Sequence, residues 1–351
     1  MAAPTERSQR RAAQSQAARA RSQTTSAGPR RVRLLGAIAL ALVVVIVVVV
    51  VLVSRGPGTS APTSTGRATL STRTLISLPA ASAIAEGDGG TWVTDDYRNV
   101  LERFDPATGH VITTRHLSGR PVAMVLAGPD LWVADMVSNS VEEVAAATLR
   151  VVRTVSVPTG PSGLAVLDGQ VWVASVITDQ VTPINARTGV LGKSLSVPAG
   201  AVRLAAGFGA LWVTGKTNGL TEIAPGDHGT GPVLPAIAVG EGPIGVATGD
   251  GAVWVANAAA GTVVRVDPTT RAVAHTYRLG GDPLSVAVAA GQVWVSDGSA
   301  QTLRILFPAP GSKVLDLDAT PRGLLAVPGG VWVGVANPGK VLMVTRPGTA
   351  G

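Results

Sequence analysis

Short runs of apolar residues, many of them rich in β-branched side chains, recur along the chain from residue 73 onward. In one stretch the runs Gly163–Leu167, Val171–Ala174, Val181–Ile184 and Val190–Val197 follow one another, with turn-forming residues between them. Runs of this length, bounded by turn residues, are typical of β-strands. This part of the chain has no segment with the 3.6-residue period of an amphipathic helix over a useful length. The pattern therefore predicts an all-β structure built from groups of four short antiparallel strands.

The four-strand group repeats seven times. Every tryptophan is followed by valine, and successive tryptophans recur at a period of about 40 residues, which indicates a repeat architecture. Four-stranded units of this size are typical of the blades of a β-propeller. Because the second strands of blades are covered on both faces, we expect the indoles to pack between blades. They are Trp92, Trp132, Trp172, Trp212, Trp254, Trp294 and Trp332.

The two ends of the repeat region are expected to complete one blade together. After the last tryptophan the chain supplies Val341–Val344 as a third strand, but no fourth strand follows. Arg73–Leu78 begins before the first tryptophan at the same interval at which Arg153–Val157 begins before the third. We therefore predict that the N-terminal strand is the outer strand of the seventh blade. It would close the ring and leave no open edge between the first and last blades.

The apolar run Leu34–Val53 is much longer than the strand-forming runs, and no polar residue interrupts it. As a helix it would span about 30 Å, the thickness of the hydrocarbon core of a bilayer. Eight arginines and one glutamate precede it in residues 1–33, whereas Arg55 is the one arginine just after it. This asymmetry predicts a transmembrane helix with a cytoplasmic N-terminus. A cleaved signal peptide, the alternative, would have an apolar region of about 7–15 residues before a small-residue cleavage site.

These patterns divide the chain into five parts. They are a disordered basic cytoplasmic tail (1–33), a transmembrane helix (34–53), a flexible stalk (54–72), a seven-bladed β-propeller (73–345) and a short tail (346–351). The net charge of +7 belongs to the first part, because residues 56–351 carry 20 Lys and Arg and 21 Asp and Glu. A nearly neutral propeller has no electrostatic footprint for nucleic acid, so we expect no such partner. The chain has no cysteine, which excludes disulfides and thiolate sites.

One repeat resembles those of a known group of propellers. Trp254–Asn257, followed by Gly261–Thr269, is similar to the repeat of YVTN-type propellers and of the related streptogramin lyase-like propellers. The resemblance covers about residues 73–345 and implies a seven-bladed propeller, in a group whose members are often extracytoplasmic. It implies no particular reaction, because this fold carries unrelated functions.

Candidate binding residues are expected at one mouth of the central channel, where loops that enter the first strands meet loops that follow the second strands. Oxygen-bearing or charged side chains occur there at Asp95, Asp135, Asn257, Asp297, Arg120, Arg203, Glu241, Asp282 and Arg322. The first four would bind Ca²⁺ or Mg²⁺ if they converged. Alternatively, Arg120 and Arg322 would clamp a carboxylate or phosphate. In a third interpretation the acids hold their own turns and pair with the arginines, without a ligand.

Catalysis has weaker support. By resemblance, a streptogramin lyase-like reaction needs a metal-assisted set with histidine and glutamate near the channel mouth. His110 and His228 fall in or beside turns at the opposite rim, and His116 and His275 fall on outer strands. We therefore predict a membrane-anchored, extracytoplasmic binding or scaffolding module for an envelope protein, an envelope polymer or a small polar ligand. A streptogramin lyase-like or hydrolytic enzyme is the alternative. We expect no cofactor unless the four oxygen-bearing residues converge, in which case it would be Ca²⁺ or Mg²⁺.

Overall fold

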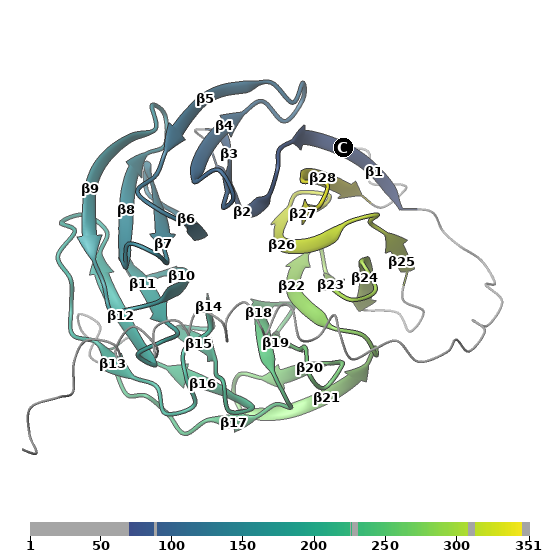
Figure 1. Ribbon diagram of the computed structural model, residues 1–351. Coiled ribbons are helices and arrows are strands. Elements are labelled where there is room, and N and C mark those ends of the chain that lie inside the picture. Colours follow the sequence, from purple (N-terminus) through teal and green to yellow (C-terminus); the bar gives the residue numbers. More distant parts are fainter. Residues whose placement is uncertain (1–69, 88–89, 225, 227–230, 308–312, 346–351) are drawn as a thin grey trace, which may run out of the picture. The chain divides into compact units, whose positions relative to one another are not determined.

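The computed structural model of the chain describes residues 70–345 apart from 88–89, 225, 227–230 and 308–312. The strands of this part form seven sheets of four antiparallel strands, arranged in a ring (Figure 1). The predicted all-β, seven-bladed propeller is therefore confirmed. The predicted tail, transmembrane helix and tail at the other end (1–33, 34–53 and 346–351) lie outside the described residues, as does nearly all of the stalk. Among the residues that are described, no helix is long and apolar enough to cross a membrane.

Blades one to six take their four strands in chain order from the centre outward, whereas the outermost strand of blade seven is β1, the first strand of the chain. Blades one to three contain β2 (Ala81–Gly87), β3 (Gly90–Asp95), β4 (Val100–Phe104) and β5 (Val111–His116); β6 (Pro121–Ala127), β7 (Asp130–Asp135), β8 (Ser140–Ala145) and β9 (Arg150–Ser156); and β10 (Pro161–Leu167), β11 (Gln170–Ser175), β12 (Gln180–Asn185) and β13 (Leu195–Ser196). Blades four to six contain β14 (Arg203–Gly207), β15 (Ala210–Thr214), β16 (Gly219–Ile223) and β17 (Ile237–Ala238); β18 (Pro243–Gly249), β19 (Ala252–Asn257), β20 (Thr262–Asp267) and β21 (Ala272–Arg278); and β22 (Pro283–Ala289), β23 (Gln292–Asp297), β24 (Thr302–Phe307) and β25 (Lys313–Asp316). Blade seven contains β26 (Thr320–Val327), β27 (Gly330–Ala336), β28 (Lys340–Thr345) and β1 (Ser71–Ser77).

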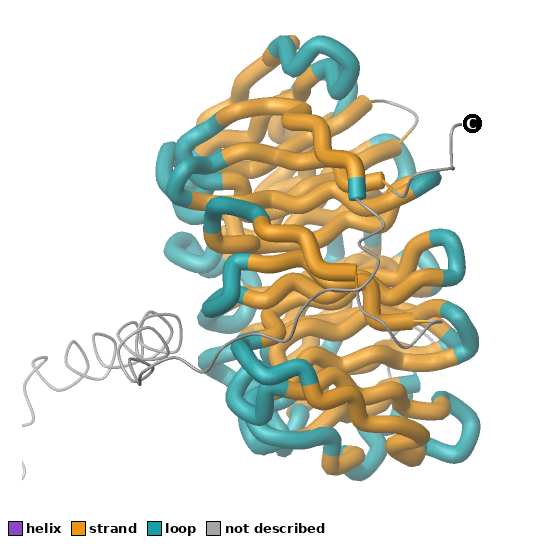
Figure 2. Tube along the Cα trace, turned by 90° about the vertical axis from the view of Figure 1, so that its right-hand side faces the viewer, coloured by secondary structure: helices purple, strands orange, loops and turns teal. Residues whose placement is uncertain are grey.

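The first strands of the blades surround the centre of the ring, because each contacts the first strands of both neighbouring blades. The connecting loops gather on two opposite rims, with the strands between them (Figure 2). We call the upper rim the one that holds the loops entering first strands and the loops between second and third strands. The lower rim holds the other turns. Alternation of strand direction within each sheet fixes this division.

The ring is closed by the N-terminal strand, as the sequence predicts. β1 pairs with β28 in antiparallel register, from Ser71 opposite Thr345 to Ser77 opposite Lys340. The strand begins at Ser71, slightly before the boundary expected at residue 73. Because β28 runs from the upper to the lower rim, Ser71 lies at the lower rim and the chain then rises toward the upper rim.

The tryptophans lie between blades, where they were expected. All seven are at most 4% exposed. Trp132 belongs to one buried cluster with Val171 and Val173 of the following blade, and Trp332 packs with Val93 across the closure between blades seven and one. Burial of one large apolar side chain contributes about 2–3 kcal/mol. The indoles therefore hold neighbouring blades together.

The outer strand of blade three is shorter than predicted. The sequence predicts a strand over Val190–Val197, whereas β13 comprises Leu195–Ser196. Pro183 on the neighbouring strand β12 has no N–H, so the ladder loses a donor there. Its carbonyl accepts a bond of 2.7 Å from the Gly192 N–H. Since the N–H and C=O of one strand residue point the same way, the missing donor would have faced the outer strand.

Candidate functional site

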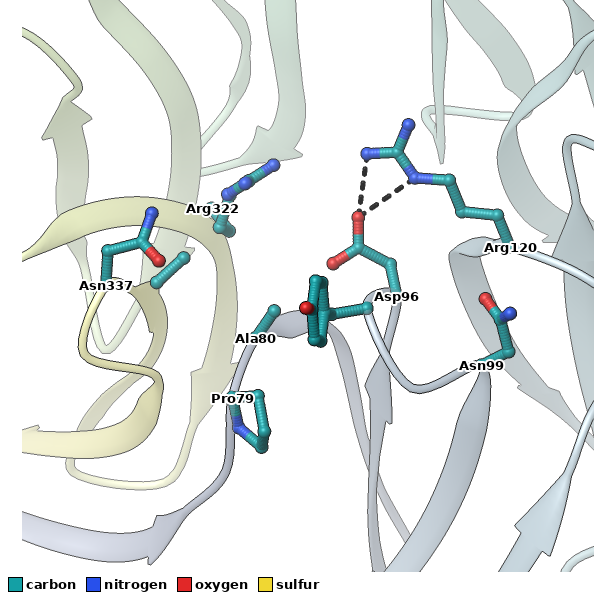
Figure 3. Close-up of a pocket in the computed structure, with 9 residues that line it drawn as sticks. Pro79, Ala80, Asp96, Asn99, Arg120, Arg322 and Asn337 are labelled. Atoms are coloured by element: carbon teal, nitrogen blue, oxygen red, sulfur yellow. Dashed lines mark hydrogen bonds and ion pairs between the residues drawn. The ribbon is translucent and has the colours of Figure 1, made fainter.

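A pocket of about 610 Å³ opens on the upper rim where blades seven, one and two meet. Its polar and charged lining consists of Asp96, Tyr97, Asn99, Arg120, Arg322 and Asn337 (Figure 3). Asp96, Tyr97 and Asn99 belong to the loop between β3 and β4, and Arg120 belongs to the loop between β5 and β6. Loops of two blades and the first strand of a third thus contribute to one concave surface.

Arg120 forms an ion pair with an acidic residue of the pocket. Its Nη2 and Nε donate to Asp96 Oδ2 at 2.8 and 3.1 Å, and Figure 3 shows both contacts. The Asp96 side chain is 9% exposed. Two donors on one carboxylate oxygen form a charge-assisted contact that neutralises the acid. This ion pair ties the blade-one loop to the blade-two loop.

Arg322 has a different environment from Arg120. It is exposed on β26 and reaches the pocket from the blade-seven side, across from Arg120 (Figure 3). Within the part of the chain that the structure describes, its guanidinium makes no ion pair or hydrogen bond. Asp96, Arg120 and Arg322 together leave one excess positive charge in the pocket. This arrangement suits an anionic group.

A second hollow, of about 180 Å³, lies among the first strands below the pocket and shares Arg322 with it. The charged residues in its described lining are Arg203 and Arg322. Arg203 donates to the carbonyl of Ser162, and burial lowers the pKa of its guanidinium from the ordinary value. Arginine stays protonated in proteins, so the channel beneath the pocket is positive as well.

The four acid and amide positions that follow the tryptophans make hydrogen bonds within the protein. Asp95 Oδ1 accepts the backbone N–H groups two and three residues later, at 2.9 and 3.0 Å, and Asp135 Oδ1 does the same at 3.0 and 3.1 Å. Asp297 Oδ1 accepts the N–H three residues later at 2.9 Å. Asn257 Nδ2 donates to the carbonyl of Val239 at 2.8 Å. The contacts of the three acids are the turn-holding contacts of the third interpretation, whereas Asn257 is bound to the segment that enters blade five.

The same four residues belong to four different blades and do not converge. No group of three or more histidine, aspartate or glutamate side chains in the described part of the chain is placed to hold a metal ion. Binding of Ca²⁺ or Mg²⁺ therefore stays a prediction.

The mouth of the channel is asymmetric in charge. On the side of blades five and six, the N–H of Asp282 donates to Asp297 Oδ1 at 3.1 Å. Burial, and next the negative charge of Asp297, raise the pKa of Asp282 above its ordinary value. Glu241 is exposed in the loop that enters blade five. Asp282 and Glu241, which make no ion pair with a described residue, thus lie on this side, whereas the unpaired Arg322 lies on the other.

Two further pocket residues carry no distinguishing sequence signal. Asn99 and Asn337 adopt φ values of 57° and 60°, which asparagine tolerates better than most residues. Asn139 and Asn218 occupy comparable loops with similar φ values. Because a turn explains the residue type equally well, the sequence does not separate a pocket asparagine from a turn asparagine.

The described histidines lie away from the pocket. His110 is in the loop between β4 and β5, His116 ends β5, and His275 lies on the outer strand β21. All three are exposed, and none lines either hollow. His228 lies outside the described residues.

No protein-family model matches the sequence, and no curated protein matches it. Solved structures do match. A catalytically inactive virginiamycin B lyase from Staphylococcus aureus, crystallised with quinupristin, has 16% identity and a TM-score of 0.70, over 79% of this chain and 99% of that one. BamB from Moraxella catarrhalis has 14% identity and a TM-score of 0.57, over 77% and 83%. BBS1N in complex with ARL6DN has 16% identity and a TM-score of 0.66, over 82% and 99%.

At identities this low the likenesses show the fold alone. The match to virginiamycin B lyase agrees with the predicted streptogramin lyase-like propeller fold. The YVTN-type assignment stays a prediction.

Proposed function

We propose that this protein is a membrane-anchored, extracytoplasmic binding module whose ligand carries a carboxylate or phosphate group that contacts Arg322. The observation that carries the proposal is the unpaired guanidinium of Arg322 in a pocket whose acid, Asp96, is neutralised by Arg120. A planar guanidinium offers two parallel donors to such an anion. The positive channel beneath the pocket reinforces this preference.

The anchored arrangement is supported by the apolar run at 34–53 and the arginines before it. Ser71, the first residue of β1, lies at the lower rim, so the preceding chain joins the propeller on the rim opposite to the pocket. A rigid ring that displays loops on its rim is suited to binding.

The partner class is an envelope protein, an envelope polymer or a small polar ligand. A propeller of similar fold, BBS1N, is described in complex with ARL6DN, which supports a protein partner. The near-neutral charge of residues 56–351 speaks against nucleic acid.

Thermal melting of the full-length protein in nanodiscs tests the proposal, with citrate and inorganic phosphate as probes. A bound anion stabilises the folded state by mass action, so millimolar citrate is expected to raise the Tm. Arg322→Gln should abolish the rise. The matched control is Arg278→Gln, an exposed arginine at the end of β21 in blade five, which should keep it. An equal rise in both variants, or none in the wild type, would contradict the proposal.

A lyase is the alternative, and the likeness to virginiamycin B lyase, crystallised with quinupristin, is what favours it. Because His110, His116 and His275 lie away from the pocket, we expect no conversion of quinupristin by the purified protein. Mass spectrometry of quinupristin incubated with the protein, with and without Mg²⁺, checks this. Conversion of quinupristin to a product would establish the enzyme and contradict the binding module.

A further inference from the structure

Three exposed apolar side chains lie on the upper rim beside the pocket. Tyr97, Val137 and Ile177 occupy the same position in blades one, two and three, five residues after the tryptophan and two after the end of the second strand. They are 81%, 65% and 46% exposed. We call these three residues the apolar arc. Tyr97 also lines the pocket, so the arc and the pocket are continuous.

The arc is held in place by buried groups beneath it. The backbone N–H groups of Tyr97 and Val137 donate to Asp95 Oδ1 and Asp135 Oδ1, and both acids are at most 1% exposed. The side chain of Ile177 lies against the loop that enters blade three: a Cβ added at Gly160 would be 2.7 Å from Ile177 Cγ1. The three side chains thus project from anchored loops.

The opposite half of the rim has a different character. The equivalent positions in blades four to seven are small or polar: Thr217, Ala259, Ser299 and Asn337. Two acidic residues, Glu241 and Asp282, lie in the loops that enter blades five and six. A ligand whose carboxylate contacts Arg322 therefore finds apolar surface in one direction and acidic groups in the other.

This asymmetry favours a peptide ligand whose anionic group is at one end of the peptide. A scattered exposed apolar residue is ordinary on a protein surface, but a set at equivalent positions of adjacent blades, continuous with a pocket, is typical of an interaction site. An acidic side chain within a longer peptide would extend the peptide on both sides of Arg322. A peptide bound through its terminal carboxylate extends from Arg322 in one direction only, and the apolar arc likewise lies on one side of Arg322.

We propose that the pocket and the apolar arc bind the C-terminal tail of a partner protein. The terminal carboxylate contacts Arg322, and apolar side chains of the preceding residues lie over Tyr97, Val137 and Ile177. This inference rests on the proposed function of the pocket and adds to it the chemistry and direction of the ligand. Charge complementarity fixes the end of the tail, and the arc favours its apolar residues.

The test uses a library of random octapeptides displayed with free C-termini and selected on the full-length protein in nanodiscs. The peptides that are enriched are synthesised as free acids and as C-terminal amides, and fluorescence anisotropy gives their Kd values. Because a charge-assisted contact is lost in the amide, the acid should bind about tenfold or more tighter. Arg322→Gln should remove that difference, and Arg278→Gln should preserve it.

A second set of variants tests the arc. Replacing Tyr97, Val137 and Ile177 together by serine should weaken binding of the free acid by about tenfold or more, because apolar contact area is lost. The matched control, Phe208→Ser, removes a 50% exposed apolar side chain from the lower rim and should leave the Kd unchanged. Equal weakening in both would overturn the role of the arc.

The outcomes separate this inference from the proposed function. If citrate raises the Tm through Arg322 but acid and amide peptides bind equally, the proposed binding of a C-terminal tail is wrong. The proposed binding of an anion by Arg322 is then still supported. If citrate has no effect and no peptide depends on Arg322, both are wrong. Circular dichroism of each variant identifies a substitution that disturbs folding, and binding by the single variants Val137→Ser and Ile177→Ser then decides the role of the arc.

Discussion

Arg120 and Arg322 lie in the same pocket and carry the same charge, but their neighbours give them different roles. Asp96 accepts two bonds from Arg120, whereas no described residue accepts one from Arg322. An arginine that already holds a carboxylate contributes to the rigidity of the loops. An arginine without a protein partner retains its donors for a ligand.

Charge at the opposite side of the mouth is expected to affect stability. The pKa of Asp282 is raised, chiefly by burial and then by Asp297. A carboxyl whose pKa is higher in the folded protein than in the unfolded chain destabilises the fold as the pH rises through that pKa. Asp282→Asn should therefore raise the Tm at neutral pH. The gain should disappear below the ordinary carboxyl pKa of about 4, where the acid is protonated in both states.

Thermal melting between pH 3 and pH 8 measures this effect, a range that brackets the ordinary pKa of an aspartate. Glu241→Gln is the control, because Glu241 is exposed in the loop that enters the neighbouring blade, and it should change the Tm little at any pH. A lower Tm for Asp282→Asn at neutral pH would show that the ionised carboxylate is stabilising.

At the scale of single strands, β1 closes the ring mainly through two side chains. Leu75 and Ile76 are 2% and 4% exposed, whereas the remaining residues of the strand are exposed. They belong to the cluster that holds Trp332 and Val93. Because removal of buried methyl groups leaves a cavity, Ile76→Ala should lower the free energy of unfolding by about 2–4 kcal/mol.

Urea denaturation of the full-length protein measures that loss. Thr72→Ala, an exposed position on the same strand, is the matched control and should stay within about 0.5 kcal/mol of the wild type. If both variants lost the same stability, β1 would not be buried against blades seven and one.

The spacing of residues in the sequence predicts the strands well, but it does not predict which side chains contact each other across blades. Tryptophans near a 40-residue period fix the number of blades because each repeat is one structural unit. The length of β13 was overestimated, because the missing N–H of Pro183 acts on a neighbouring strand. The pairing of Arg120 with Asp96 joins residues 24 positions apart on two blades. Distances across blades follow from packing, which a local pattern does not contain.

The candidate site was predicted in part for the same reason. The mouth of the channel, with Arg120 and Arg322 close in ring order, follows from the blade order, and the structure places both in one pocket. Which of the two is paired does not follow. The exposure of Val137 and Ile177 likewise depends on loops that project them outward.

At the scale of the whole molecule, the pocket lies where the ring closes. Ala80, just beyond β1, forms an isolated bridge with Ala336 of blade seven, and both line the pocket. The N–H of Leu78 donates to the carbonyl of Gly339 at 3.1 Å. Closure by β1 therefore brings blade seven beside blade one and sets the distance between Arg322 and the Asp96 loop.

The most direct test of this closure is a disulfide between β1 and β28. Ser71 and Thr345 are paired, with Oγ and Oγ1 2.6 Å apart, and the chain has no cysteine of its own. The double variant Ser71→Cys, Thr345→Cys should form a disulfide on mild oxidation, raise the Tm by constraining the unfolded chain, and keep its response to citrate. Ser77→Cys with Thr345→Cys, at opposite ends of the strand pair, should stay reduced. A first pair that stays reduced, or a disulfide that forms equally well in the second pair, would contradict a ring closed by its N-terminal strand.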